Sequence, residues 1–299
     1  MSEVAQTAAA QHRPANSEPL VAIDDVRFTW PGKRGFTLAI EQFAISRGER
    51  VLIVGPSGGG KSTFLGLLCG TLQPASGSIA MLGADIAKLS ASQRDRFRAD
   101  HIGIVFQMFN LLPYCTVIDN VVLPLSFGAA RRARIGNGQA ARTEAARLLT
   151  RLGLDVDELG HERASSLSVG QQQRVAVARA LIAAPELIVA DEPTSSLDRD
   201  RQRDFLALLF AEVAAAKSTL VMVSHDRSLG PQFDRMVELA SFARATSGFA
   251  GGLSPAPIRE GDPPKPAPVL SQNRVGPGGL LPAGSGAGLR ARQRFAGAT

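Results

Sequence analysis

The sequence predicts an α/β fold, and three observations lead to this prediction. Residues 51–54 form a short apolar run that leads into a glycine-rich loop and then into a helix-forming stretch. Other short apolar runs end directly in polar residues, among them Gln107, Asp191 and His225. Stretches with the periodicity of amphipathic helices separate these runs. Short, fully apolar runs between helices are typical of buried strands in a sheet that helices cover.

The composition is that of a globular protein. With 299 residues, 44% of them hydrophobic, the chain can build one large core or two small ones. The net charge of +6 comes from 33 basic against 27 acidic residues spread along the chain, which suits an anionic membrane surface as well as a nucleic acid. Cys69 and Cys115 lack the spacing of a metal site, so we expect reduced thiols in a cytosolic protein and leave a single disulfide open. No apolar run approaches the roughly 18 to 20 residues that cross a bilayer, and the first residues lack the pattern of a signal segment, so we expect neither a membrane span nor secretion.

The amino-terminal part predicts an arm followed by an antiparallel pair of strands. Residues 1–19 are rich in Ala, Gln and Ser without periodicity, and we expect them to be disordered. Residues 21–29 and 36–45 are rich in β-branched and aromatic residues, with a Pro-Gly-Lys turn between them. Trp30, the only tryptophan, stands at the end of the first strand, where it could stack on an adenine base or serve as an ordinary aromatic at the rim of the core.

Residues 55–62 read Gly-Pro-Ser-Gly-Gly-Gly-Lys-Ser and fit the spacing G-x-x-x-x-G-K-[ST] of a phosphate-binding loop. Glycines let successive backbone N–H groups point at phosphate oxygens, and no Cβ blocks their approach. We expect Lys61 to reach the β- and γ-phosphates and Ser62 to ligate Mg²⁺, which prefers oxygen ligands. A helix continuing from Thr63 would face the anion with its positive end. The alternative is a glycine turn that matches the pattern by chance.

A second polar strand end follows. The chain turns at residues 74–77 into a strand at 78–82, and a further apolar strand occupies 102–106. This strand ends at Gln107, which is either a ligand at the edge of the sheet where α/β domains bind or a solvated loop residue.

Residues 120–160 have the periodicity of helices. The clearest amphipathic piece is 141–152, which Gly153 would cap. Because residues 131–139 are rich in arginine and glycine, we expect an exposed loop there.

The next helix and strand carry candidate site residues. Ser168 and Gln171 form a capping box before an amphipathic helix that Pro185 terminates, and the exposed N-terminus of this helix, near Gly170, offers a second anion site. An apolar strand at 187–190 ends in Asp191 and Glu192. Adjacent acids there are costly to bury without a partner, which favours a metal or a catalytic role over a solvated strand end. Asp191 would hold the water shell of Mg²⁺, and Glu192 could polarise an attacking water.

The last predicted strands close the sheet. Residues 199–215 predict a surface helix, and a buried strand at 219–223 ends in Ser-His-Asp. His225 therefore shares the edge of Gln107 and Asp191, where it could touch a γ-phosphate; the alternative is a structural histidine. A last strand is expected at 235–239. Beyond residue 240 the chain is rich in Gly, Pro, Ala and Ser with scattered arginines, which predicts a disordered basic tail, either with a function or without one.

Five segments together resemble the ATP-binding cassette (ABC) ATPases. They are GPSGGGKST, FQ at residues 106–107, LSVGQQQRVAVARAL at 167–181, LIVADEPTSSLD at 187–198 and SHD at 224–226. The resemblance covers about residues 20–239, and its LSxGQ segment separates this family from other phosphate-loop enzymes. It implies an α/β P-loop NTPase cassette with a RecA-like core, an antiparallel β subdomain and an α-helical signature subdomain. The domains expected are the arm at 1–19, the cassette at 20–242 with its helical subdomain at about 108–182, and the disordered tail at 243–299.

The resemblance also assigns roles to individual residues. The catalytic set it implies is Glu192 as catalytic glutamate, His225 as switch histidine and Gln107 as Q-loop glutamine. The Mg²⁺ ligands it implies are Ser62, Gln107 and Asp191. The residues implied to bind ATP are Trp30, Gly55, Pro56, Ser57, Gly58, Gly59, Gly60, Lys61, Ser62, Thr63, Ser168, Gly170, Gln171 and Asp198. Val169 departs from the pattern, because many members have glycine there; we still expect the signature to function.

The resemblance further implies partners. Two copies would pack head to tail as a homodimer, with ATP between the Walker A loop of one copy and the signature helix of the other, and the pair would drive separate integral membrane permease subunits. The stretch VFQMFNLLPYCTVIDNVVLPL looks most like the subfamily of lipoprotein-release, macrolide-export and glycolipid-export systems, which implies export or mechanotransmission. The place implied is the cytoplasmic face of the inner membrane, with a periplasmic or adaptor component and no nucleic acid. An importer ATPase for amino acids or similar solutes and a division-type regulatory cassette remain as alternatives. Nothing in the sequence names the cargo.

Overall fold

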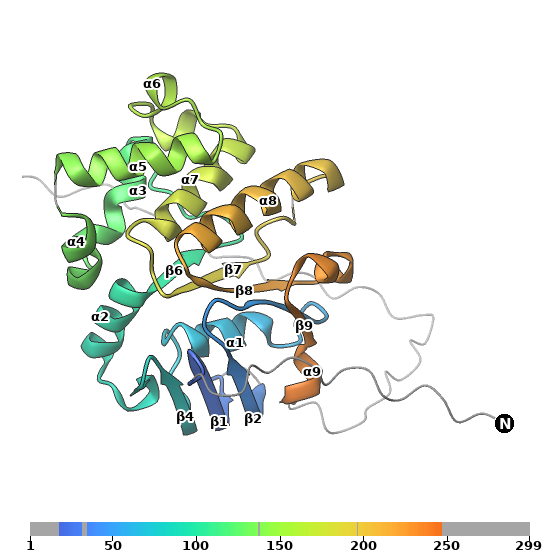
Figure 1. Cartoon of the computed structure of the whole chain (residues 1–299). Coiled ribbons are helices and arrows are strands. Elements are labelled where there is room, and N and C mark those ends of the chain that lie inside the picture. Colours follow the sequence, from blue (N-terminus) through green and yellow to red (C-terminus); the bar gives the residue numbers. More distant parts are fainter. Residues whose placement is uncertain (1–17, 32–34, 137, 196, 247–299) are drawn as a thin grey trace, which may run out of the picture. The chain divides into compact units, whose positions relative to one another are not determined.

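The computed structural model describes residues 18–31, 35–136, 138–195 and 197–246, and these form two sheets with helices around them (Figure 1). The predicted arm at 1–19 and tail at 243–299 fall almost entirely outside the described residues. Within the described part, no helix is both long and apolar enough to cross a lipid bilayer.

The two sheets differ in strand direction. The first is antiparallel, in the order β10-β2-β1-β4-β5, with β1 at Val21–Thr29, β2 at Thr37–Ile45, β4 at Ser76–Met81, β5 at Ala84–Asp85 and β10 at Ala243–Thr246. The second is parallel, in the order β6-β7-β8-β3-β9, with β3 at Arg50–Val54, β6 at Ile102–Val105, β7 at Leu187–Asp191, β8 at Thr219–Ser224 and β9 at Arg235–Glu238. The predicted strands are confirmed, with small shifts at their ends.

Helices cover both faces of the parallel sheet (Figure 1). The α-helices are α1 Lys61–Leu68, α2 Ala91–His101, α3 Val117–Val122, α4 Ala129–Ile135, α5 Gln139–Arg151, α6 Val156–Leu159, α7 Val169–Leu181, α8 Arg199–Ala215 and α9 Leu239–Phe242. Short 3-10 turns lie at Ile86–Lys88, Leu123–Ser126, Ala164–Ser166 and Arg227–Gln232. Helix α1 lies between the two sheets, and α7 and α8 lie on the opposite side of the parallel sheet (Figure 1).

The parallel sheet is buried on both faces, each in a core of its own. Because successive side chains of a strand point to opposite faces, a continuous apolar run serves both cores. Leu52 and Met222 pack in the core formed with α3, α5, α7 and α8. Ile53 and Val223 pack in the core formed with α1 and the antiparallel sheet. This explains why the predicted strands are apolar throughout instead of alternating.

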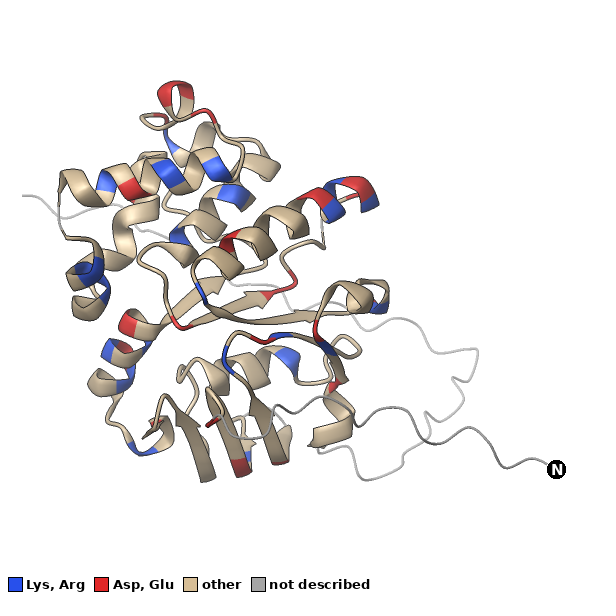
Figure 2. Ribbon diagram, viewed as in Figure 1, with Lys and Arg blue, Asp and Glu red and all other residues tan. Residues whose placement is uncertain are grey.

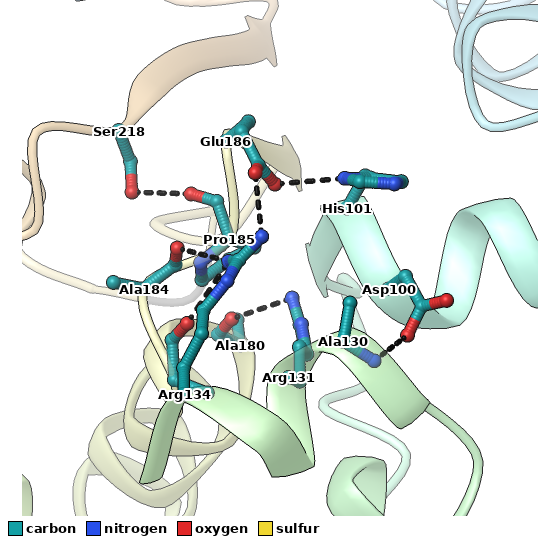
Figure 3. Close-up of polar contacts among 11 residues, drawn as sticks. Asp100, His101, Ala130, Arg131, Arg134, Ala180, Ala184, Pro185, Glu186 and Ser218 are labelled. Atoms are coloured by element: carbon teal, nitrogen blue, oxygen red, sulfur yellow. Dashed lines mark hydrogen bonds and ion pairs between the residues drawn. The ribbon is translucent and has the colours of Figure 1, made fainter.

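The predicted exposed loop at 131–139 is wrong over its first half, where the structure has helix α4. Arg131 is only 1% exposed, and its Nη2 lies 3.5 Å from the carbonyl oxygen of Ala180 (Figure 3). Arg134 pairs with Glu186 at 2.5 Å (Figure 3). Burial, reinforced by the charge of Arg134, lowers the pKa of Arg131 to about 10. The sequence predicted a solvated segment here because the groups that accept hydrogen bonds from these arginines lie in distant parts of the chain.

The boundary of the predicted tail also needs a correction. Ala243–Thr246 forms strand β10 and pairs antiparallel with β2, from Ala243 opposite Ile40 to Thr246 opposite Thr37. The cassette therefore continues four residues beyond the predicted end at 242. A short strand of mostly exposed residues adds backbone hydrogen bonds but little apolar burial, so its pattern is weak in the sequence.

Both signs of charge occur on the same helices. Figure 2 shows basic and acidic residues side by side on α2, α5 and α8. Several of them pair three residues apart, for example Arg98 with Asp95 at 2.6 Å and Arg147 with Glu144 at 2.7 Å. Local pairing of this kind neutralises much of the charge on these helices.

Candidate functional site

Four strands of the parallel sheet carry the predicted site residues at their carboxyl ends. Strand β3 leads into the glycine-rich loop, β6 into Gln107, β7 into Asp191 and Glu192, and β8 into His225. The strands are in register, with Val54 opposite Ser224. Because parallel strands end at one edge, residues far apart in the sequence meet there.

A cavity of about 450 Å³ opens at this edge. Its lining comes from the residues just after β1 and just before β2, the glycine-rich loop, helix α1 and the segments at the ends of β6 and β7. The lining residues are Trp30, Phe36, Ser57, Gly58, Gly60, Lys61, Ser62, Thr63, Gln107, Asp191 and Glu192. The structure thus brings together most of the residues that the sequence predicted to bind nucleotide and Mg²⁺.

The loop at 55–62 has a backbone that requires glycine at its end. Gly60, which precedes α1, has φ of 99°, a left-handed conformation that L-residues rarely adopt. A Cβ there would also lie 3.1 Å from Leu38 Cδ1. Lys61 is buried, and its Nζ donates to the carbonyl oxygens of Gly55 and Pro56 at 2.8 and 3.1 Å. The ammonium group is therefore held within the mouth of the loop.

Glu192 lies between a lysine and a histidine. Its Oε1 is 3.3 Å from Lys61 Nζ, and its Oε2 is 3.1 Å from His225 Nδ1. Glu192 has φ of 43°, so its backbone also lies in the left-handed region. Its N–H donates to the carbonyl oxygen of Val223, which ties this turn to β8. Contacts from the start of α1 and from the end of β8 thus hold the carboxylate at the cavity wall.

Asp191 provides an oxygen donor in the same cavity. Burial raises the pKa of its carboxyl group, the charge of Glu192 raises it further, and Lys61 and a hydrogen bond from Ser62 oppose the rise. Two neighbouring acids with a nearby hydroxyl, partly withdrawn from water, are a donor set that a hard divalent cation such as Mg²⁺ stabilises. Ser62 and Asp191, with Gln107 in the same cavity wall, therefore fit the predicted ion.

Trp30 stands in the cavity wall beside the loop. Its indole N–H donates to Thr63 Oγ1 at 3.1 Å, and its ring meets Phe28 edge to face at 5.3 Å between centroids. These contacts fix the ring next to α1. Its role in stacking on a base stays a prediction.

The signature residues lie elsewhere. Ser168 caps α7 and forms the predicted capping box with Gln171 in both directions. Ser168, Gly170, Gln171 and Asp198 do not line the cavity described above. Asp198 instead caps α8 by accepting from the backbone N–H of Arg201 at 2.9 Å. Within one chain, the two predicted anion sites are therefore separate.

Among the described residues of the cavity wall, the sequence did not predict Phe36. Phe36 lines the cavity, and its carbonyl oxygen accepts from the backbone N–H of Trp30 at 3.1 Å. The signal was present, because an antiparallel pair that places Trp30 at one strand end places its partner residue beside it.

Comparisons with known proteins agree with this arrangement. The family model described as "ABC transporter" matches residues 39–195. The macrolide export ATP-binding/permease protein MacB 1 of Aeromonas hydrophila is 38% identical over 261 residues, which is 87% of this chain and 38% of that protein. An uncharacterised ABC transporter ATP-binding protein of Mycobacterium tuberculosis is 43% identical over 196 residues, 65% of this chain and 56% of its own length. The chain thus spans between about two fifths and just over half of these relatives.

Solved structures show the same fold. The ATP-binding cassette MJ0796, in a dimeric post-hydrolysis state bound to ADP and phosphate, is 33% identical with a TM-score of 0.63, covering 73% of this chain and 93% of that one. The cbiO1 protein from Clostridium perfringens is 25% identical with a TM-score of 0.63, covering 78% and 86%. The predicted P-loop NTPase fold is confirmed. With a phosphate-loop cavity, a separate capped signature helix and a family match over more than half of its residues, the chain belongs to the ABC transporter family as an ATP-binding cassette.

Proposed function

We propose that this chain is the ATP-hydrolysing subunit of an ABC transporter and drives export through membrane permease subunits on separate chains. The observation that carries the proposal is the position of Glu192 in the wall of the phosphate-loop cavity, in contact with Lys61 of the same wall and with His225, which is outside the lining. A carboxylate held by a histidine, beside a lysine that can bind phosphate, suits hydrolysis of a γ-phosphate by water.

Each residue has a distinct role in this mechanism. The loop N–H groups and Lys61 bind the phosphates and oppose their charge. Glu192 accepts a proton from the attacking water, and His225, 3.1 Å away, keeps its carboxylate pointed at that water. Ser62, Asp191 and Gln107 would hold Mg²⁺, which would supply neutralisation of the phosphate charge. Trp30 offers its ring to the adenine base.

The second half of each site comes from another copy. Ser168, Gly170 and Gln171 lie at the N-terminus of α7 and outside the lining of the chain's own cavity, so backbone N–H groups there would be available to a phosphate on a partner. Support comes from MJ0796, a cassette whose structure with ADP and phosphate is dimeric. We propose a homodimer here as well, with the two copies packed head to tail, closed by ATP binding and opened by hydrolysis.

The permease would bind near Gln107. The segment that follows β6 exposes apolar side chains, with Met108 80% and Tyr114 71% exposed. Exposed apolar residues beside a site residue are suited to contact with another protein. Export is favoured because several relatives are named as macrolide export proteins. The cassette would then work at the cytoplasmic face of the inner membrane, with a periplasmic or adaptor component completing the exporter.

The test is co-purification of the tagged chain from membranes, followed by assay of the assembled complex. We expect a permease in the complex, phosphate release that depends on Mg²⁺, and ATP-driven pairing of cassettes. A complex without any of these activities would contradict the proposal. Recovery with a solute-binding protein would indicate import instead, and recovery with a cell-wall regulator would indicate a division-type system.

A further inference from the structure

A buried glutamine joins the signature helix to the turn that carries Glu192. Gln173 lies on the second turn of α7 and is only 1% exposed. Its Nε2 donates to the carbonyl oxygen of Pro193 at 2.7 Å, and this hydrogen bond is buried. Pro193 directly follows Glu192 in the chain. One side chain thus connects the element that bears Ser168 to the residue next to the proposed general base.

The turn needs such support. The backbone of Glu192 is left-handed, with φ of 43°, which a residue other than glycine holds only when its surroundings fix it. The N–H of Glu192 is fixed by Val223, and its carbonyl oxygen accepts from Ser195 at 3.2 Å. Gln173 supplies the hydrogen bond to the next carbonyl group. Without that donor, the buried carbonyl group of Pro193 would lose its hydrogen bond. The turn would then shift so that this carbonyl group could reach another donor.

We infer that Gln173 is a positioning residue for Glu192 and couples the two nucleotide sites of the dimer. The inference rests on the proposed function. In the head-to-tail pair, the α7 N-terminus of a chain contacts the nucleotide bound to the partner chain, whereas Glu192 acts on the nucleotide bound to its own chain. Movement of α7 onto the partner's nucleotide is transmitted through the Gln173 amide to Pro193 and orients Glu192. Binding in one site therefore prepares hydrolysis in the other.

The first experiment is Gln173→Met in the assembled complex, a change that keeps the side-chain volume and removes the donor. We expect kcat to fall on the order of tenfold to a hundredfold, as for other small misplacements of a catalytic group. The KM for ATP should stay near the wild-type value, because Gln173 does not line the phosphate-loop cavity. The Hill coefficient for ATP should exceed 1 in the wild type and fall toward 1 in the variant.

The matched control is Ser218→Ala. Ser218 Oγ donates to the carbonyl oxygen of Pro185 at 2.6 Å, so it is another buried bond to a proline carbonyl, at the opposite end of β7. This variant should keep the wild-type kcat and Hill coefficient even if its melting temperature falls.

A second variant distinguishes a loss of kcat caused by misplacement of Glu192 from one caused by a general defect in folding. Gln173→Glu keeps the shape but donates only when the carboxyl group is protonated, and burial raises the pKa of such a group. Its kcat relative to wild type should recover as the pH is lowered toward about 6. The ratio for Gln173→Met should stay constant with pH.

The inference is overturned if Gln173→Met has the wild-type kcat, if the Hill coefficients of wild type and variant are equal, or if Gln173→Glu shows no recovery at lower pH. Failure of the proposed function is distinct from these outcomes, because the wild-type complex would then release no phosphate.

Discussion

At the scale of single residues, Glu192 depends on side chains from the start of α1 and from the end of β8. Lys61 and His225 each contact one of its carboxylate oxygens, at 3.3 and 3.1 Å. A carboxylate shared in this way is aimed by its neighbours and is available to bind water. The proposed catalytic role can therefore be tested by changing charge without changing shape.

Glu192→Gln should abolish ATP turnover while ATP still binds. The amide cannot accept the proton from water, whereas the loop and Lys61 still hold the phosphates. The dimer should then stay closed on ATP, which size-exclusion chromatography with light scattering would detect. Unchanged phosphate release by the variant complex would remove Glu192 from its proposed role.

Lys61→Ala should weaken ATP binding at least tenfold, because a buried ammonium that faces the phosphates is lost. Equilibrium titration with a fluorescent ATP analogue measures this directly. Lys88→Ala is the control, since the Lys88 side chain is 82% exposed and pairs with Asp85, away from the cavity lining. Equal affinity in the two variants would mean that Lys61 is structural.

At the scale of elements, α4 is attached to the core by a cluster of polar contacts (Figure 3). Arg134 Nη1 donates to the carbonyl oxygen of Ala184 at 2.8 Å, and its Nη2 pairs with Glu186. His101, at the end of α2, lies 3.0 Å from the other oxygen of Glu186. The cluster thus joins α2, α4 and the connection between α7 and β7.

Glu186 should make stability depend on pH. Burial by itself raises the pKa of Glu186, but the hydrogen bond from His101 and the charge of Arg134 outweigh it and lower the pKa. A carboxyl group with a lowered pKa stabilises the fold above its unfolded pKa and loses this contribution as the pH falls through the folded value. We expect Glu186→Gln to reduce the free energy of unfolding by about 1–3 kcal/mol at pH 7.

Denaturant titrations at several pH values would measure this effect. The difference between wild type and Glu186→Gln should shrink as the pH falls below about 4.3, the usual pKa of glutamate. Asp200→Asn is the control, because the pair of Asp200 with Arg203 is largely exposed and worth little. A difference that stays constant with pH would show that the charge of Glu186 does not stabilise the fold.

At the scale of the whole molecule, the segment after Ser247 is predicted to be dispensable for catalysis. Its composition predicts a tail, and the described residues that line the cavity all lie before it. A chain truncated after Ser247 should keep the ATPase activity of the full-length complex within about twofold, since no cavity residue is removed. A large loss would show that the tail takes part in the reaction.

A second truncation, which removes more residues, serves as the contrast. A chain that ends before Ala243 also loses β10, which exposes the edge of β2. This variant should melt at a lower temperature and aggregate more readily than the chain truncated after Ser247. Equal melting temperatures would mean that β10 contributes nothing to the fold.

The sequence predicts those parts of the molecule whose signal is local. The strands of the parallel sheet are visible as continuous apolar runs, and the loop at 55–62 is recognised by the spacing of its glycines, lysine and serine. Helix α4 was missed because its arginines are stabilised by Glu186 and by carbonyl groups near Ala184, which lie about 50 residues away along the chain. Strand β10 was missed because it gains most of its stability from pairing with β2.

The sequence by itself determined the chemistry of the edge: a phosphate loop, two adjacent acids, a glutamine and a histidine, each within two residues of the end of a predicted strand. Only the tertiary structure decided how they meet, with Glu192 between Lys61 and His225, and that Gln173 of α7 bonds to the turn beside Glu192. The physical reason is that a residue's type and its local pattern specify strands and loops. A hydrogen bond or ion pair between groups far apart in the sequence exists only once packing has fixed both groups.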